Sequence, residues 1–472
     1  MRYKSLTGKV IFCTLIFFMM LMAAAPASSY AAALVKVVIN GQNMSFDVNP
    51  IIENNRTLVP FRGIGESLGA SVNWDQKTKT ITAYKDSSTV VLTVGSTTAY
   101  VNSKPVKLDA APKIYNNRTL VPLRFFSEAF GASVAWDNSS RTVYIYTGEK
   151  LAKYIMGYYY SQSYDDFMKN YDKMSAAAVK WYTLDQYGNV TDNDTSRWIM
   201  TPQGYEDVLK FAKSQNVDMH MLLFESDSAK LKQVLSTRES RERLVKQIMT
   251  VVEREGYDGV NIDFEYLSST DKDKFNEFII GLSEALHAKG KSLNISLPVK
   301  TEKADWWPGY DYKTLGKYCD FVVLMAYDKN PSNPEPQAGI DWVEEVVDYA
   351  IARIPANKVV LGIGYFGYDW YNGKKAAVVP TRNGMTYVNA IDELQVKYGL
   401  KLSVDSKSGM SYGTYTDENG IVHQIWMEND SLVDTKAKLV IRKGLKGIAV
   451  WRLGYTTPSF WNTVTKNFIP AR

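Results

Sequence analysis

The stretch Asp258-Gly259-Val260-Asn261-Ile262-Asp263-Phe264-Glu265 alternates apolar and polar side chains over its last six positions. Successive side chains of a β-strand point to opposite faces, so Asn261, Asp263 and Glu265 share one face. A polar group buried without a partner costs about 1–3 kcal/mol, so three in a row on a core strand are expensive. The pattern therefore predicts an active-site strand. A structural ladder of hydrogen-bonded polar groups is the alternative that the spacing leaves open.

Apolar strands recur on both sides of this one and alternate with segments of helical periodicity, such as 272–287 and 342–351. Eight strand–helix units over residues 151–472 predict an α/β fold, a (β/α)8 TIM barrel with a parallel sheet covered by helices. Residues 368–430 separate the seventh strand from a helix near 436–442, and we interpret them as a small inserted α+β subdomain. The predicted strands are 154–159, 177–182, 218–224, 259–264, 292–297, 321–327, 359–365 and 447–451.

Two further segments lie where strands of such a barrel end. Met325-Ala326-Tyr327-Asp328 closes the sixth predicted strand, and Trp451 closes the eighth. Together with the fourth strand they resemble family 18 glycoside hydrolases, the chitinase family, whose fourth-strand signature is Asp-x-x-Asp-x-Asp-x-Glu. The chain departs from this signature at Asn261, and the resemblance covers residues 151–470. The matching positions of the signature are Asp258, Asp263 and Glu265.

The resemblance implies a glycosidase that uses substrate assistance, in which the sugar's own 2-acetamido oxygen attacks C1 in place of a carboxylate nucleophile. Glu265 would be the general acid and later the base that activates water. Asp263 would orient the acetamido N–H, and the Tyr327 hydroxyl would hold the acetamido carbonyl. Trp451 would form an apolar floor beneath the sugar. These roles demand an N-acetylated sugar at the cleaved position, and the function we expect is hydrolysis of β-1,4 bonds at N-acetylglucosamine.

Asn261 stands where the family pattern has an aspartate that shares a proton with the next one. An amide does not titrate, but it can donate a hydrogen bond to Asp263, and it removes the repulsion between two carboxylates. We therefore expect an active enzyme with an altered pH profile. This asparagine, Gly367-Tyr368-Asp369-Trp370 and Trp426-Met427-Glu428 resemble the subgroup of spore-cortex and cell-wall N-acetylglucosaminidases of spore-forming bacteria.

Several residues near strand ends or in the insertion are candidates for sugar contact, with ordinary packing as the competing interpretation. Glu225, at the end of the third strand, is interpreted as a surface carboxylate. The sequence has no phosphate-binding glycine loop, no Ser–His–Asp arrangement and no metal-ligand spacing, so we expect no cofactor and no metal. The candidate substrate-binding residues are Asp258, Asn261, Met325, Asp328, Trp451, Tyr158, Tyr365, Asp369, Trp370 and Glu428.

An internal repeat precedes the barrel, over residues 34–147. The segment 54–62 (NNRTLVPFR) recurs at 116–124 (NNRTLVPLR), an offset of 62 residues. The repeats resemble the copper amine oxidase N-terminal-like domain of exported bacterial proteins. The sequence has 3 histidines, all outside this segment, so a histidine-rich copper site is excluded there. We interpret the repeats as a module for targeting to the cell surface or the cell wall, with a plain spacer as the alternative.

Residues 1–33 are interpreted as a secretory signal peptide, with basic Arg2, Lys4 and Lys9 before an apolar run. A membrane anchor is the alternative, which is disfavoured because the apolar run is short and ends in small residues. Removing them lowers the formal charge from +5 to about +2, so nothing favours nucleic acid as a partner. The remaining cysteine, Cys319, has no intramolecular disulfide partner and is expected to be buried. We expect a secreted or wall-associated bacterial monomer that is free of the membrane once the signal is cleaved.

The leading hypothesis is a β-N-acetylglucosaminidase that acts on peptidoglycan or spore cortex. A chitinase with the same mechanism is the second, and a non-catalytic, lectin-like sugar-binding barrel is the third. A wall-bound structural protein is the fourth, although it leaves the polar strand unexplained. Endo or exo action is left open by the sequence.

Overall fold

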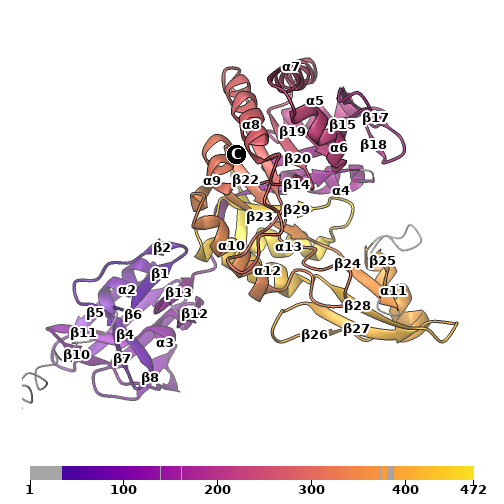
Figure 1. Cartoon of the computed structure of the whole chain (residues 1–472). Helices are drawn as coiled ribbons and strands as arrows, with labels where there is room; N and C mark the ends of the chain where they lie inside the picture. Colours follow the sequence, from indigo (N-terminus) through magenta and orange to yellow (C-terminus); the bar gives the residue numbers. More distant parts are fainter. Residues whose placement is uncertain (1–33, 139, 161, 372–373, 380–386) are drawn as a thin grey trace, which may run out of the picture. The chain divides into compact units, whose positions relative to one another are not determined.

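The computed structural model describes residues 34–472 apart from 139, 161, 372–373 and 380–386 (Figure 1). The predicted signal peptide lies outside these residues. The chain forms two compact units, one made mainly of residues 43–145 and the other mainly of residues 146–472. None of the helices in the described part of the chain combines the length and the apolar character that crossing a lipid bilayer requires.

The second unit is the predicted barrel. Within the described residues, eight strands pair in parallel in chain order, and the first strand also pairs with the eighth, which closes the ring. The sequence prediction of a (β/α)8 fold is thereby confirmed. The barrel strands are β14 (Leu151–Tyr159), β15 (Ala176–Leu184), β19 (Asp218–Glu225), β20 (Gly259–Phe264), β21 (Ser292–Leu297), β22 (Phe321–Leu324), β23 (Val359–Gly364) and β29 (Gly447–Trp451).

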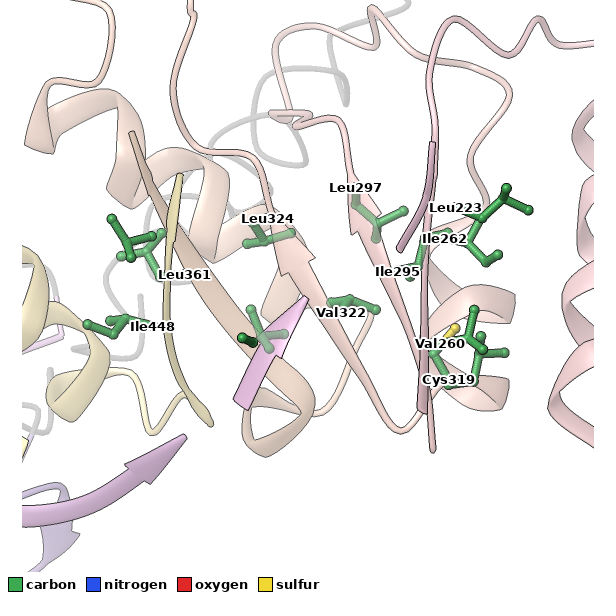
Figure 2. Packing of buried hydrophobic residues seen from close by; sticks show 14 of the residues in the cluster. Leu223, Val260, Ile262, Ile295, Leu297, Cys319, Val322, Leu324, Leu361 and Ile448 are labelled. Atoms are coloured by element: carbon green, nitrogen blue, oxygen red, sulfur yellow. The ribbon is translucent and has the colours of Figure 1, made fainter. Parts of the chain in front are cut away.

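Helices surround the ring because the outward side chains of the strands are aliphatic and need a cover. Figure 2 shows this layer, in which Val260 and Ile262 of β20 pack beside Ile295 of β21, with Cys319 buried nearby. The helices are α4 (Tyr164–Asn170), α5 (Tyr205–Ser214), α6 (Ser228–Leu235), α7 (Arg238–Glu255), α8 (Lys272–His287), α9 (Tyr312–Tyr318), α10 (Ile340–Ile351), α12 (Asp430–Arg442) and α13 (Pro458–Asn467), with the 3-10 turns η1 (Tyr171–Lys173) and η2 (Ala356–Lys358).

Capping residues set where several of these helices begin. The Thr237 hydroxyl accepts a hydrogen bond from the Ser240 backbone N–H, and the Ser240 hydroxyl accepts one from the Thr237 backbone N–H. The two bonds form a capping box at the start of α7. Asp227, Asp311 and Asn429 cap α6, α9 and α12 with their side chains. Short strands complete this unit: β16 (Val190–Thr191), β17 (Asn193–Asp194), β18 (Ile199–Met200) and β30 (Phe468–Pro470).

The predicted insertion after the seventh strand is confirmed as an α+β subdomain. Its sheet has the order β25-β24-β28-β27-β26 and is antiparallel. Leu394, Ile425 and Met427 belong to a small core of its own between helix and sheet. The elements are β24 (Gly367–Tyr371), β25 (Lys374–Val379), α11 (Tyr387–Tyr398), β26 (Ser403–Val404), β27 (Ser411–Thr416) and β28 (Val422–Met427).

The first unit consists of two copies of one pattern of strands and a short helix. Its central sheet has the order β10-β11-β4-β3, and β4 and β11, the equivalent strands of the two repeats, pair antiparallel. The elements are β1 (Lys36–Ile39), β2 (Gln42–Asn43), β3 (Ile51–Glu53), β4 (Arg56–Pro60), α2 (Phe61–Ser67), β5 (Ser71–Asp75), β6 (Thr80–Lys85), β7 (Ser88–Thr93), β8 (Thr98–Val101), β9 (Lys104–Lys107), β10 (Lys113–Tyr115), β11 (Arg118–Pro122), α3 (Leu123–Glu128), β12 (Ser133–Asp137) and β13 (Thr142–Tyr146).

Candidate active site

The carboxyl ends of the barrel strands bring the main predicted residues to one rim. Asp263 lies in β20, and Glu265 is the first residue after that strand. Tyr327 lies three residues after the end of β22, and Trp451 is the last residue of β29. All strands of a parallel barrel point the same way, so their carboxyl ends share one face, where catalytic groups of such barrels lie. Burial raises the pKa of both Glu265 and Tyr327, and the charge of Asp263 raises both further.

Glu265 has the environment of a general acid. Its side chain is half-buried at the rim, and burial, followed by the charges of Asp263 and Asp328, raises its pKa to about 7, while Lys180 opposes the shift. A carboxyl group with a pKa near 7 carries a proton for part of its population at neutral pH and releases it readily. It can therefore give a proton to a leaving group and take one back from water.

Asp263 is buried, and its two oxygens face different surroundings. Oδ2 lies 3.9 Å from the ammonium nitrogen of Lys180. Oδ1 is buried and has no hydrogen-bond donor among the described residues. Burial raises the pKa of Asp263, and the charge of Lys180 lowers it. A buried acceptor without a donor is costly, so Oδ1 is suited to an N–H group that a ligand brings.

Lys180 is the residue that the sequence analysis missed. It interrupts the apolar run of β15, and its side chain is only 11% exposed. Its ammonium nitrogen lies 3.3 Å from the ring centroid of Phe224 and 4.8 Å from that of Trp451. Burial lowers its pKa, whereas Asp263 and Glu265 raise it. A lysine within an otherwise buried strand is the sequence signal that could have identified it.

The expected hydrogen bond from Asn261 to Asp263 is absent from the contacts of Asn261, and this expectation was wrong. The Asn261 amide nitrogen donates instead to Asn294 Oδ1, and Asn261 Oδ1 accepts from the Ser296 hydroxyl at 3.1 Å. Ser296 also shares a hydrogen bond of 2.8 Å with the Tyr158 hydroxyl. Residue 261 thus faces the barrel interior, where Asn294 and Ser296 of β21 satisfy its amide.

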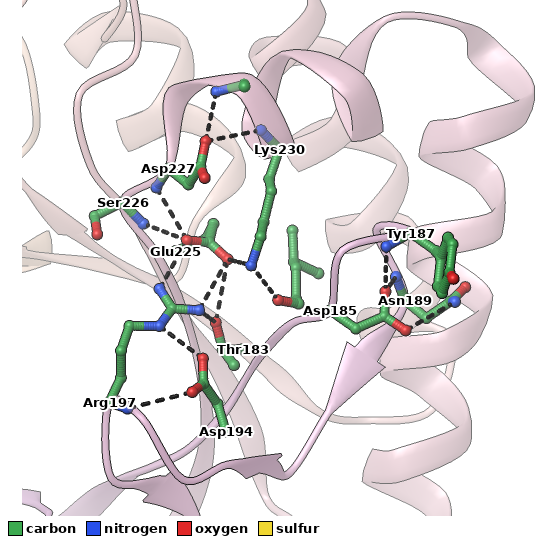
Figure 3. A network of polar contacts seen from close by, with 12 residues as sticks. Thr183, Asp185, Tyr187, Asn189, Asp194, Arg197, Glu225, Ser226, Asp227 and Lys230 are labelled. Atoms are coloured by element: carbon green, nitrogen blue, oxygen red, sulfur yellow. Dashed lines mark hydrogen bonds and ion pairs between the residues drawn. The ribbon is translucent and has the colours of Figure 1, made fainter.

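The rim around Glu265 is held by a network centred on Glu225, shown in Figure 3. Glu225 is fully buried, and its carboxylate accepts from Arg197 at 2.9 Å and lies 3.5 Å from Lys230. Burial raises the pKa of Glu225, but hydrogen bonds from Arg197 and from the Asp227 backbone lower it below its usual value. The interpretation of Glu225 as a surface carboxylate was therefore wrong.

This network reaches the candidate acid through the backbone. The Glu265 N–H donates to the carbonyl oxygen of Glu225 at 2.9 Å, which fixes the chain where β20 ends. The Arg197 guanidinium lies 6.0 Å from the Phe224 ring that Lys180 also contacts, and its charge contributes to the lowered pKa of Lys180. Among the described residues, no cluster of His, Cys, Asp and Glu is arranged to hold a metal ion.

The comparisons with known proteins agree with this geometry. The sequence model of the glycosyl hydrolases family 18 matches residues 154–455, which is more than half of the chain. The chain belongs to glycoside hydrolase family 18. The sequence model of the copper amine oxidase N-terminal domain matches residues 38–145 of this family 18 protein.

Relatives of this family 18 protein include the uncharacterized glycosylase YvbX of Bacillus subtilis, 30% identical over 310 residues, 64% of this chain and 88% of that protein. The cortical fragment-lytic enzyme of Bacillus subtilis is 29% identical over 271 residues, 54% of this chain and 61% of that protein. Among solved structures, a chitinase from Chromobacterium violaceum is 29% identical, with a TM-score of 0.60, over 67% of this chain and 98% of that one. The protein is therefore a glycoside hydrolase.

Tyr158 and Asp328 join the cluster of the family 18 barrel, and Asp258 does not. Tyr158 contacts Trp451, with ring centroids 5.6 Å apart, and Asp328 accepts from the Tyr368 hydroxyl at 2.8 Å. Met325 is half-buried directly after β22. Asp258 instead precedes β20, at the end opposite to Glu265, where its carboxylate accepts from the Met219 backbone at 2.9 Å. The prediction of a substrate contact for Asp258 is therefore corrected to a structural role.

Four further predicted contacts of the family 18 site are also corrected, because these side chains are buried and bonded within the protein. Each has a polar atom in a short contact within the protein, and none of the contacts given below involves Asp263, Glu265 or Tyr327. Tyr365 donates to Asp430 at 2.7 Å, Asp369 accepts from Tyr415 at 2.7 Å, Trp370 donates to the Pro331 carbonyl at 3.1 Å, and Glu428 pairs with Lys436 at 2.7 Å.

Proposed function

We propose that this glycoside hydrolase is exported and cleaves β-1,4 bonds at N-acetylglucosamine in peptidoglycan or spore cortex, with retention and substrate assistance. One observation carries the proposal: a buried carboxylate oxygen without a donor, Asp263 Oδ1, lies beside a carboxyl group with a pKa of about 7, Glu265. The first is suited to the N–H of a 2-acetamido group, and the second to the proton that the leaving oxygen needs.

In the first step, Glu265 donates its proton to the glycosidic oxygen as the bond to C1 breaks. The acetamido carbonyl oxygen of the same sugar attacks C1 from the opposite face and forms an oxazolinium ion. Asp263 accepts the hydrogen bond of the acetamido N–H and balances the new positive charge. Tyr327 has a hydroxyl whose pKa burial holds well above its usual value, so it stays protonated and donates to the acetamido carbonyl.

In the second step, the Glu265 carboxylate removes a proton from water, and the oxygen of that water attacks C1. The bond between C1 and the acetamido oxygen breaks, so the acetamido group is regenerated and Glu265 is again protonated. Two displacements at C1 retain the configuration of the sugar. Trp451, beside Tyr158 at the rim, provides the apolar surface beneath the sugar.

Lys180 fits this mechanism as a positioning residue. Its ammonium group, 3.9 Å from Asp263 Oδ2, favours the ionised form of Asp263, which has to receive an N–H and face a cation. With Asn261 in place of an aspartate, Asp263 has no neighbouring carboxyl two residues earlier with which to share a proton. The charge of Lys180 thus maintains a carboxylate that its burial disfavours.

The choice of peptidoglycan or cortex rests on the cortical fragment-lytic enzyme among the relatives. Chitin is the second candidate, favoured by the chitinase of Chromobacterium violaceum, whose chain is matched over 98% of its length. Both substrates present the 2-acetamido group that the mechanism requires. The mechanism is therefore common to both, and product analysis separates them.

The test is mass spectrometry of products from peptidoglycan, spore cortex fragments and chitin oligosaccharides, with Glu265→Gln as the control. Loss of the general acid should lower the rate about 10²–10⁴-fold. De-N-acetylated chitosan oligosaccharides provide a second control, because they lack the internal nucleophile and should not be cleaved. Fragments with N-acetylglucosamine at the new reducing end support the proposal. The proposal is overturned if neither the wild type nor the Glu265→Gln variant releases fragments, or if the wild type cleaves the de-N-acetylated oligosaccharides.

A further inference from the structure

The repeat unit contains two grooves that are copies of each other. The first, of about 700 Å³, is lined by residues that include Asn55-Arg56-Thr57, Arg124 and Trp136. The second, of about 490 Å³, is lined by residues that include Asn117-Arg118-Thr119 and Trp74. Each of the twelve residues that line the second groove has a counterpart, 62 positions away in the sequence, among those that line the first. The sequence repeat thus extends to the lining of both grooves.

The pairing of β4 with β11 explains the duplication. Val59 lies directly opposite Val121, and these two valines are 62 positions apart. Each of the two strands therefore pairs with the equivalent strand of the other repeat. The two repeats are thus related by an approximate twofold axis between the strands. Each groove combines the strand of one repeat with the helix of the other, so Arg56 of β4 faces the same groove as Arg124 of α3. Neither repeat forms a groove alone.

The groove walls carry charged and aromatic side chains. Arg56 and Asp109 form an exposed ion pair of 2.7 Å in the first groove, and Arg118 and Asp47 form the equivalent pair in the second. Exposed pairs of this kind contribute only about 0–1 kcal/mol to stability. Trp136 leaves 37% of its surface exposed in the first groove. An exposed aromatic ring in one groove with guanidinium and carboxylate groups offers an apolar surface and hydrogen-bonding groups, which suits a sugar ligand.

The two grooves differ in charge. The lining of the first contains four basic and two acidic residues, and that of the second contains two of each. Lys107 and Arg141 account for the difference, since the position equivalent to Lys107 is Ser45 and no basic counterpart of Arg141 lines the second groove. An excess of positive charge favours a saccharide that carries carboxylates, such as a glycan with acidic peptide stems.

We propose that these grooves are two saccharide-binding sites and that the repeat unit grips two separate strands of an acidic wall glycan. The choice of a wall glycan rests on the proposed function, whereas the existence of two sites rests on the repeat geometry. A twofold axis reverses any direction perpendicular to it, and a polysaccharide has two different ends. One straight strand that runs perpendicular to the axis therefore meets the second groove in the reverse direction, whereas two separate strands can each enter a groove in the same direction relative to its walls.

The experiment uses the full-length chain with Glu265→Gln, so that the polymer stays intact while binding is measured. Sedimentation with insoluble peptidoglycan is compared for Arg62→Ser, Arg124→Ser and the double substitution, and Lys104→Ser is the control for loss of an exposed charge outside both grooves. Two linked sites multiply their effects, so the double substitution should weaken retention by tenfold or more beyond either single one. Retention of the double variant equal to that of the Lys104→Ser control overturns the proposal.

Calorimetric titration with soluble glycan oligomers that carry peptide stems counts the sites. The double substitution should lower the stoichiometry by two, because the barrel site remains in both proteins. An unchanged stoichiometry contradicts the two-site proposal even when hydrolysis by the wild-type enzyme is confirmed. Neutral chitin oligosaccharides should bind the first groove more weakly than the acidic oligomers. Equal affinity for both overturns the assignment of an acidic ligand.

Discussion

Replacing Glu265 by glutamine should lower the rate of hydrolysis about 10²–10⁴-fold and, at the same time, stabilise the folded barrel at alkaline pH. Burial and the neighbouring Asp263 raise the pKa of Glu265 from 4.5 to about 7. One pKa unit corresponds to about 1.4 kcal/mol, so ionising this group in the folded state costs on the order of 3 kcal/mol. Glutamine keeps the shape of the side chain and does not ionise.

The sign of the effect follows from proton binding. Below pH 4.5 the carboxyl group is protonated in both states, and the substitution should change the free energy of unfolding little. Between pH 4.5 and about 7 the unfolded state releases the proton first, so wild-type stability falls as pH rises. The advantage of the Glu265→Gln variant should therefore grow over this window and reach its full size near pH 8.

Urea denaturation at pH 4.5 and pH 8 measures the difference, with tryptophan fluorescence as the signal. Nine of the 11 tryptophans lie beyond residue 145, so the signal reports mainly on the barrel. Glu206→Gln, at an exposed position of the same barrel, is the matched control. If Glu265→Gln is no more stable than wild type at pH 8, the buried, proton-holding environment assigned to Glu265 is refuted.

Three further predictions concern the rate. kcat/KM of the wild-type enzyme should fall as pH rises through about 7, because Glu265 must be protonated to act as the acid; a flat profile from pH 6 to 9 contradicts this. Lys180→Met should move both the acidic limb of the pH profile, where Asp263 ionises, and the alkaline limb, where Glu265 ionises, to higher pH, because the lysine charge lowers the pKa of both groups. The exposed Lys210→Met should move neither limb. Tyr327→Phe should lower kcat about 10–100-fold through loss of one hydrogen bond worth about 1–3 kcal/mol, and a rate near wild type removes Tyr327 from the mechanism.

The barrel could be predicted from the sequence because its strands are continuous apolar runs. The predicted bounds of β20, β21 and β29 match the structure at both ends. The sixth strand was predicted to reach residue 327 but ends at Leu324, because the Ala326 and Tyr327 N–H groups turn back to the carbonyls of Leu324 and Met325. An apolar pattern that continues through a turn does not show where the ladder of hydrogen bonds stops.

The contacts of the site were harder to predict than its position on the strands. Alternation along β20 places Asp263 and Glu265 on the rim, but Lys180 reaches them from another strand, and its partner depends on how the ring closes. In the insertion, Asp369 and Trp370 looked like sugar contacts. A sequence does not show which face of a small sheet is covered, and both side chains proved to be buried.

Asn261 offers the sharpest test of how this site balances its charges. Replacing it by aspartate matches the family signature, yet we expect the enzyme to lose activity and stability as pH rises. The Asn261 amide nitrogen donates to Asn294 Oδ1, and a carboxylate in its place would set two acceptors against each other. Turning the Asn294 amide is no remedy, because its nitrogen already donates to the Val260 carbonyl and is bonded to His220 Nδ1, at 3.0 and 2.7 Å.

The new carboxyl group therefore has to remain protonated, with its pKa raised by burial and by Asp263 two residues away. Its cost should be absent below its unfolded pKa and should grow to about 1–3 kcal/mol as pH rises toward 8. Urea denaturation and kcat/KM at pH 4.5 and pH 8 measure this, with the exposed Asn193→Asp as the control. If Asn261→Asp is as stable and as active at pH 8 as the wild type, then Asn294 can rearrange. In that case the amide at position 261 is not required to keep Asp263 ionised, and Lys180 alone stabilises the charge of Asp263.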